Sequence, residues 1–125
     1  MPGQKLVLIV EDDRLIRLLS AELLLEAGVG ILDAADGEEA VELLEQRATE
    51  IAAVITDVRM PGGCSGLDLA QRVTERWPWI SILVTSGHFL ERPPGLPQKA
   101  QFLRKPWKPE KLLDFASWAA RSDVR

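Results

Sequence analysis

Residues 6–13 read LVLIVEDD. Five branched apolar side chains that stop abruptly at three acids are typical of a strand buried on both faces, as in a parallel sheet. After this strand the apolar residues change to helical spacing, and we expect Asp13 to cap a helix that ends at Gly28. Its predicted buried stripe is Ile16, Leu19, Leu23 and Ala27.

The same alternation of strand and helix continues to the end of the chain. Further strand-like runs lie at 29–35, 51–56, 80–84 and 101–104, and helical spacing lies at 36–48, 69–77 and 109–119. Asp36, with Glu39 three residues later, predicts the start of the second helix. Where a fourth helix is expected, Pro93, Pro94 and Pro97 predict a short or irregular segment. The pattern predicts an α/β fold with a doubly wound five-stranded parallel sheet and helices on both faces.

Length and charge narrow the class of protein. The chain has 125 residues, 15 Lys and Arg and 19 Asp and Glu, so its formal charge is −4 and its length suits one domain. No basic run exceeds Arg104-Lys105, which argues against direct nucleic-acid contact. No apolar run approaches the roughly 18 residues of a membrane helix, and Cys64 has no second thiol for a disulfide. We expect a cytoplasmic protein with no membrane contact, in which the single histidine, His88, lies in a solvated loop.

Polar residues follow four of the expected strands. Glu11 and Asp12 come after the first, Asp57 after the third, Thr85 after the fourth and Lys105 after the fifth. In an open parallel sheet these ends share one edge, so the three carboxylates should repel one another unless a cation lies between them. Oxygen ligands favour Mg²⁺, and a hydroxyl with an ammonium suits a transferring phosphoryl group. These residues point to Asp57 as the nucleophile.

Four motifs at these strand ends together resemble the receiver domain of two-component response regulators. They are LIVEDD at 8–13, ITDVRMPG at 55–62, LVTSG at 83–87 and FLRKP at 102–106. The resemblance covers about residues 5–120, so we expect a single receiver domain over residues 1–125, which leaves no room for an output domain. It implies a flavodoxin-like strand order of 2-1-3-4-5.

The resemblance also implies a phosphoacceptor and a metal site. Asp57 matches the residue that takes a phosphoryl group from a histidine of a sensor kinase or phosphotransfer protein. Glu11 and Asp12 match the acidic pair that holds Mg²⁺, with Asp12 as a direct ligand and Glu11 acting mainly through water. Arg59 matches the position whose backbone carbonyl completes the metal site. Such a domain is a regulatory phosphoacceptor, which catalyses only its own phosphorylation and dephosphorylation.

Three further residues match the family's switch. Lys105 would pair with the phosphoryl group, and the Lys105–Pro106 bond is commonly cis in the family. Thr85 would move onto the phosphoryl oxygens, and the ring of Phe102 would turn inward with it and signal to a downstream protein partner. The sequence departs from the family in the loop GGCSG at 62–66, about one residue longer than usual, and in the Pro-rich segment at 92–97.

Two other functions stay open at this stage. A haloacid-dehalogenase-like phosphatase also forms an aspartyl phosphate, but that family carries its nucleophile after the first strand and a second Asp two residues later. Here Asp57 follows the third expected strand and precedes Val58 and Arg59. A degenerate receiver used only as a scaffold is the second alternative, and the presence of all five site residues argues against it.

Overall fold

The computed structural model describes residues 5–60, 62–87 and 91–121, so His88 and Pro61 of the expected loop lie outside the described residues. Strands and helices alternate along the chain as predicted, except that the described residues between the last two strands contain no helix. In chain order the elements are β1 (Leu6–Val10), α1 (Arg14–Glu26), β2 (Ile31–Ala34), α2 (Gly37–Arg47), a 3₁₀ turn (Ala48–Glu50), β3 (Ile51–Asp57), α3 (Gly66–Arg76), β4 (Ser81–Ser86), β5 (Gln101–Arg104) and α4 (Pro109–Arg121).

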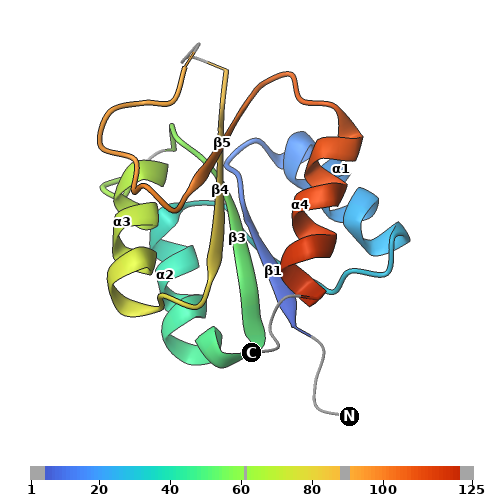
Figure 1. Cartoon of the computed structure of the whole chain (residues 1–125), viewed down its shortest axis with the longest axis horizontal. Helices are drawn as coiled ribbons and strands as arrows, with labels where there is room; N and C mark the ends of the chain where they lie inside the picture. Colours follow the sequence, from blue (N-terminus) through green and yellow to red (C-terminus); the bar gives the residue numbers. More distant parts are fainter. Residues whose placement is uncertain (1–4, 61, 88–90, 122–125) are drawn as a thin grey trace.

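The five strands form one parallel sheet in the order β2-β1-β3-β4-β5. This confirms the predicted order 2-1-3-4-5. Helices α2 and α3 cover one face, and α1 and α4 cover the other (Figure 1). From β1 the chain continues to β2 on one side of the sheet, and β3, β4 and β5 then follow on the other side of β1, so the strand order reverses between β1 and β3. The carboxyl ends of β1 and β3 therefore form the switch point at which such sheets carry their sites.

Two apolar clusters fill the space between the sheet and its helices. Successive residues of β1 alternate between them, with Leu8 and Val10 facing α2 and α3 and Val7 and Ile9 facing α1 and α4. This alternation explains why the strand is apolar without interruption, since both of its faces are buried. The helices contribute the residues Ala40, Leu44, Leu69 and Val73 to the first cluster and Leu24, Leu112, Phe115 and Ala116 to the second.

The first two helices begin where the sequence predicts. The Asp13 carboxylate accepts a hydrogen bond from the Ile16 backbone N–H at 3.0 Å. At α2 the Asp36 carboxylate accepts from the Glu39 N–H at 2.8 Å, and the Glu39 side chain accepts from the Ala35 N–H at 2.8 Å. These bonds satisfy backbone donors that have no partner inside the helix.

The predicted buried stripe of α1 is wrong at Leu19 and Ala27, whereas Leu23 packs partly buried against the second cluster and Ile16 is half-buried. Leu19 is 55% exposed and Ala27 lies at an exposed position, whereas Ser20, Ala21 and Leu24 are the buried residues of this helix. Leucines surround much of the helix, so the spacing alone does not single out one face. The packing against β2 and α4 selects the face that carries the small residues. The leucines left exposed are Leu15, Leu18, Leu19 and Leu25.

The described part of the segment between β4 and β5 is irregular, as the prolines predict. Its described residues, 87 and 91–100, contain turns and no helix. The Arg92 guanidinium donates to the carbonyl oxygens of Ala100, at 2.6 Å, and Pro97. Leu96 and Ala100 are buried against the cluster beneath α2 and α3. In place of a helix, turns at residues 91–100 therefore cover this part of the apolar cluster, and the hydrogen bonds of Arg92 stabilise them.

Three strands differ at their ends from the sequence prediction. Strand β2 is confined to Ile31–Ala34, within the expected run 29–35, β3 continues one residue further, to Asp57, and β4 spans Ser81–Ser86 in place of the expected 80–84. Within the described ranges, no helix combines the length and the hydropathy that a bilayer span requires.

Candidate functional site

Three carboxylates converge where β1 and β3 end. Glu11 and Asp12 follow β1, and Asp57 is the last residue of β3. Each offers one oxygen, and these oxygens lie within 4.8 Å of one another. Glu11 is buried, Asp57 is half-buried and Asp12 is exposed, so the cluster opens to solvent on one side. The structure therefore brings together the three acids that the sequence places at this edge.

Lys105 joins two of these acids. Its Nζ lies 3.0 Å from Oε1 of Glu11 and 3.3 Å from Oδ2 of Asp57. Its backbone N–H donates to the carbonyl oxygen of Ser86 at 2.8 Å, which continues the pairing of β4 and β5 past the end of β5. The following Lys105–Pro106 bond is cis, as the resemblance to the receiver family implies. One ammonium thus neutralises part of the charge that would otherwise separate the carboxylates.

Burial and charge act in opposite directions on this pair. Burial raises the pKa of Glu11, and the hydrogen bond and charge of Lys105 only partly offset that effect. For Lys105, burial alone lowers the pKa, but the hydrogen bond and charge of Glu11, together with Asp57, raise it above its ordinary value. Lys105 is therefore a cation at neutral pH, and a second cation at the cluster would favour the ionised form of Glu11.

Thr85 lies on β4, beside the strand of Asp57, and Phe102 lies one strand further out, on β5. Thr85 is Asp57's partner in the register of β3 and β4, and its carbonyl oxygen accepts from the Val58 N–H at 3.0 Å. Phe102 pairs with Val84 in the next strand and packs, partly exposed, against the cluster beneath α2 and α3. Arg59 is exposed two residues after Asp57. The hydroxyl and the ring thus lie on adjacent strands, one register position apart.

Two residues that hold the backbone around Asp57 in place are not predicted from the sequence. Gly66, the first residue of α3, donates its N–H to the Val58 carbonyl oxygen at 2.8 Å. A Cβ built on Gly66 would lie 2.0 Å from the Asp57 carbonyl oxygen, so only glycine fits at this position. Glu38 accepts a hydrogen bond from the Gly63 N–H at 3.0 Å and thus ties the long loop to α2. Twenty-five residues separate Glu38 from Gly63, and no local pattern indicates their contact.

Arg17 is a third residue at the site that is not predicted from the sequence. Its Nη1 donates to the backbone carbonyl oxygen of Glu11 at 2.8 Å. A signal exists in hindsight, because Arg17 lies one helical turn after the capping residue Asp13, and side chains on a helix lean towards its N-terminus.

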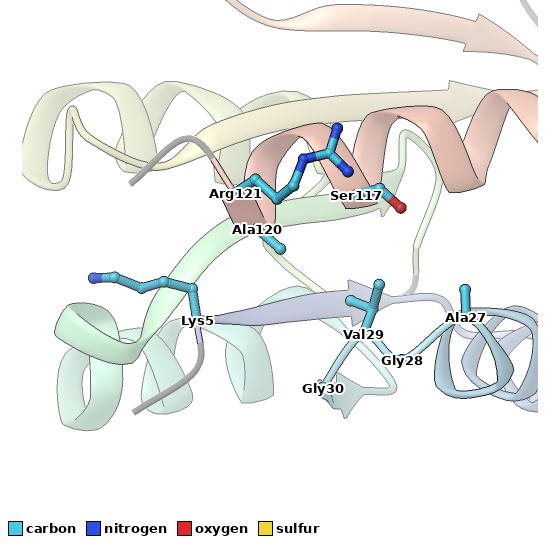
Figure 2. Close-up of a pocket in the computed structure, with 8 residues that line it drawn as sticks. All are labelled: Lys5, Ala27, Gly28, Val29, Gly30, Ser117, Ala120 and Arg121. Atoms are coloured by element: carbon cyan, nitrogen blue, oxygen red, sulfur yellow. The ribbon is translucent and has the colours of Figure 1, made fainter. Parts of the chain in front are cut away.

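A hollow lies away from the acidic cluster, at the amino end of β1 (Figure 2). It measures about 300 Å³ and is bordered by Lys5, Gly28, Ser117 and Arg121 among others. The side chains of Lys5 and Arg121 extend in different directions (Figure 2), and the Lys5 ammonium donates to the Thr49 carbonyl oxygen at 2.8 Å. Because its two cations do not converge, this hollow lacks the arrangement of a charged-ligand site.

A doubly wound parallel sheet with an acidic cluster and a lysine at its switch point defines the class of receiver-like phosphoacceptors. A family model described as the response regulator receiver domain matches residues 7–117, and the chain belongs to that family. The match favours the receiver over the phosphatase considered above. Domains of this family are regulatory, accept a phosphoryl group in two-component signalling and interact with histidine kinases or phosphotransfer proteins.

Proteins similar in sequence to this chain include a sensor kinase and a transcriptional regulatory protein. The chain is 31% identical over 115 residues to the sensor kinase CckA of Brucella abortus, which covers 90% of the chain and 12% of the kinase. It is 36% identical over 110 residues to the transcriptional regulatory protein CpxR of Escherichia coli, over 86% of the chain and 45% of CpxR. A response regulator receiver protein from Sinorhizobium medicae has a similar crystal structure, with a TM-score of 0.87, 25% identity and 98% of both chains covered. The chain thus spans less than half the length of either curated relative.

Proposed function

We propose that Asp57 is the phosphoacceptor of this receiver and that Lys105 is the residue that pairs with the transferred group. The observation that carries the proposal is the Lys105 ammonium 3.3 Å from the Asp57 carboxylate, within a cluster of three acids at the switch point. In the reaction, an Asp57 carboxylate oxygen attacks the phosphorus of a phosphohistidine. The P–O bond to Asp57 forms as the P–N bond breaks, and the imidazole leaves. Lys105 then balances charge on the phosphoryl oxygens.

The donor set fits Mg²⁺. The carboxylates of Asp12 and Asp57 and the backbone carbonyl of Arg59 would hold the ion, with Glu11 acting mainly through water, because Mg²⁺ takes one or two carboxylates, keeps waters and leaves positions for phosphate oxygens. When bound, Mg²⁺ supplies positive charge that neutralises the carboxylates and the phosphoryl oxygens. Burial raises the pKa of Glu11, and positive charge from Mg²⁺ would favour its ionised form. The pKa of Lys105 is raised by Glu11 and Asp57, so its ammonium adds a second positive charge at the site.

Thr85 and Phe102 are the proposed switch. Thr85 lies beside Asp57 in the register, so its hydroxyl needs only a local movement to reach a phosphoryl group on Asp57. Phe102 is partly exposed on the strand next to Thr85, so the core does not enclose its ring completely, and the proposed movement turns the ring inward. Movement of both side chains would change the surface around β4 and β5. That surface would then carry the signal to a downstream protein.

We further propose the following setting for the domain. Residues 5–120 form the core of one receiver domain within 1–125, in agreement with the family match over 7–117. The donor is a sensor histidine kinase or a histidine phosphotransfer protein. The domain contacts neither nucleic acid nor membrane and works in the cytoplasm, where a free cysteine such as Cys64 stays reduced. It catalyses only its own phosphorylation and dephosphorylation.

The direct test is the intact mass of the protein after incubation with a small acyl phosphate. With Mg²⁺ the mass should increase by one phosphoryl group, and with EDTA in place of Mg²⁺ it should not change. Asp57→Asn should fold normally and stay unmodified. A folded wild-type protein that gains no mass with Mg²⁺ would refute the proposal and would favour the scaffold alternative.

A further inference from the structure

The backbone N–H, the carboxylate and the carbonyl oxygen of Glu11 all make hydrogen bonds. Its backbone N–H donates to the Ala34 carbonyl oxygen in β2 at 3.1 Å. Its carboxylate accepts from the Lys105 ammonium at 3.0 Å and from the Asp13 N–H at 3.2 Å. Its carbonyl oxygen accepts from Nη1 of Arg17 at 2.8 Å. Of these contacts, the one from Arg17 is made by a long side chain that reaches back from α1.

This contact acts on the peptide that joins the two members of the acidic pair. The Glu11 carbonyl group and the Asp12 N–H belong to the same planar unit, so a bond that fixes the carbonyl also fixes the direction in which Asp12 begins. Asp12 is exposed, and surrounding side chains do not bury it. The placement of its carboxylate relative to that of Glu11 therefore depends strongly on the backbone that Arg17 holds.

The charge of Arg17 has the opposite effect on a cation. A guanidinium is protonated at every accessible pH, so Arg17 adds positive charge beside the carboxylates and by charge alone weakens the binding of a second cation. It contacts a carbonyl oxygen and leaves the carboxylate oxygens to other partners. Positioning and charge thus predict opposite signs for the removal of Arg17.

We propose that Arg17 is a positioning residue for the acidic pair Glu11 and Asp12. By holding the peptide between them, Arg17 strengthens the binding of Mg²⁺. The inference rests on the proposed function in taking this cluster as the Mg²⁺ site. Residues that orient metal ligands from behind typically change metal affinity by about 10- to 100-fold when they are replaced. We expect a loss near the lower end of that range, because Arg17 acts through the backbone.

The experiment compares Arg17→Met with Arg14→Met by calorimetric titration of the metal-free proteins with Mg²⁺. Arg14 is exposed on the same helix, so its replacement removes the same charge without the bond to Glu11. The dissociation constant should rise about tenfold for Arg17→Met and stay within twofold of the wild-type value for Arg14→Met. An Arg17→Met protein that binds Mg²⁺ as tightly as the wild type, or more tightly, would overturn the inference.

Amide hydrogen exchange in the absence of metal provides the second readout. The Asp13 N–H, which donates to the Glu11 carboxylate, should exchange several-fold faster in Arg17→Met, while the amide of Leu24 in the core should be unchanged. Arg17→Lys keeps the charge and one donor and should recover part of the Mg²⁺ affinity. Equal exchange at Asp13 in wild type and Arg17→Met would contradict the positioning role.

The outcome separates this inference from the proposed function. A wild-type protein that binds Mg²⁺ and loses affinity with Arg17→Met, but is never phosphorylated on Asp57, keeps the inference and removes the function. A wild-type protein that binds no Mg²⁺ overturns the inference.

Discussion

Replacement of Gly66 by alanine should displace the backbone of the phosphoacceptor. A Cβ on Gly66 would lie 2.0 Å from the Asp57 carbonyl oxygen and 2.8 Å from the Asp57 carbonyl carbon. Ordinary contacts begin at 3.4 Å, so 3.4 − 2.0 leaves 1.4 Å that one of the two segments must move. Both are backbone, and α3 is held in place by the capping box of Ser65 and Asp68. No flexible side chain can absorb the overlap.

The cost follows from the size of this overlap. Overpacking a well-packed interior costs about 1–3 kcal/mol, and a clash of two backbones belongs at the upper end, about 3 kcal/mol. For a domain of this size that loss lowers the melting temperature by roughly 10 °C. Because the atom that is displaced belongs to Asp57, the rate of phosphorylation should fall more than the stability of the fold alone explains.

Gly87→Ala is the matched control. Gly87 follows β4 near the same site, but the nearest atom to its added Cβ is Cβ of Lys105, at 3.8 Å. We expect its unfolding free energy to stay within about 0.5 kcal/mol of the wild type. Urea denaturation and the initial rate of mass gain with a small acyl phosphate measure both effects. A Gly66→Ala protein with wild-type stability and rate would refute the steric argument.

Three further perturbations test the packing. Leu24→Ala should lower the free energy of unfolding by about 2–5 kcal/mol because Leu24 is fully buried, whereas Leu15→Ala, at a 64% exposed position, should change it by less than about 0.5 kcal/mol in urea denaturation. Burial raises the pKa of Cys64, so at neutral pH its alkylation by iodoacetamide should be slower than in the urea-unfolded chain and should accelerate only above the ordinary thiol range; equal rates at neutral pH would contradict this. Arg92→Ala removes the hydrogen bonds to Pro97 and Ala100, and we expect a loss of about 1 kcal/mol in the same denaturation assay, with an unchanged midpoint as the contrary result.

The strands and the edge that carries the site follow from local sequence. A run such as 6–10 is uniformly apolar because both faces of the strand are buried, and the acids after it stand where the chain leaves the core. Asp13 and Asp36 cap their helices through bonds to residues three positions later, so both signals are complete within one turn. The shared edge then follows from the parallel arrangement of the strands.

Contacts between distant segments do not follow from local sequence. The buried face of α1 is selected by its packing against β2 and α4, which the leucines of the helix do not encode by themselves. The bond between Glu38 and Gly63 spans 25 positions. The close approach of Gly66 to Asp57 depends on how α3 returns to the end of β3. Each of these features requires the assembled sheet.

The central claim is that the phosphoryl group is carried by Asp57, and its direct measurement is the position of that group. Borohydride reduces an aspartyl phosphate to homoserine, which peptide mass spectrometry locates. After incubation with Mg²⁺ and a small acyl phosphate, homoserine should be found at position 57 alone, and Asp57→Asn should contain none. Homoserine at another aspartate, or a phosphorylated protein without homoserine at position 57, would contradict the account.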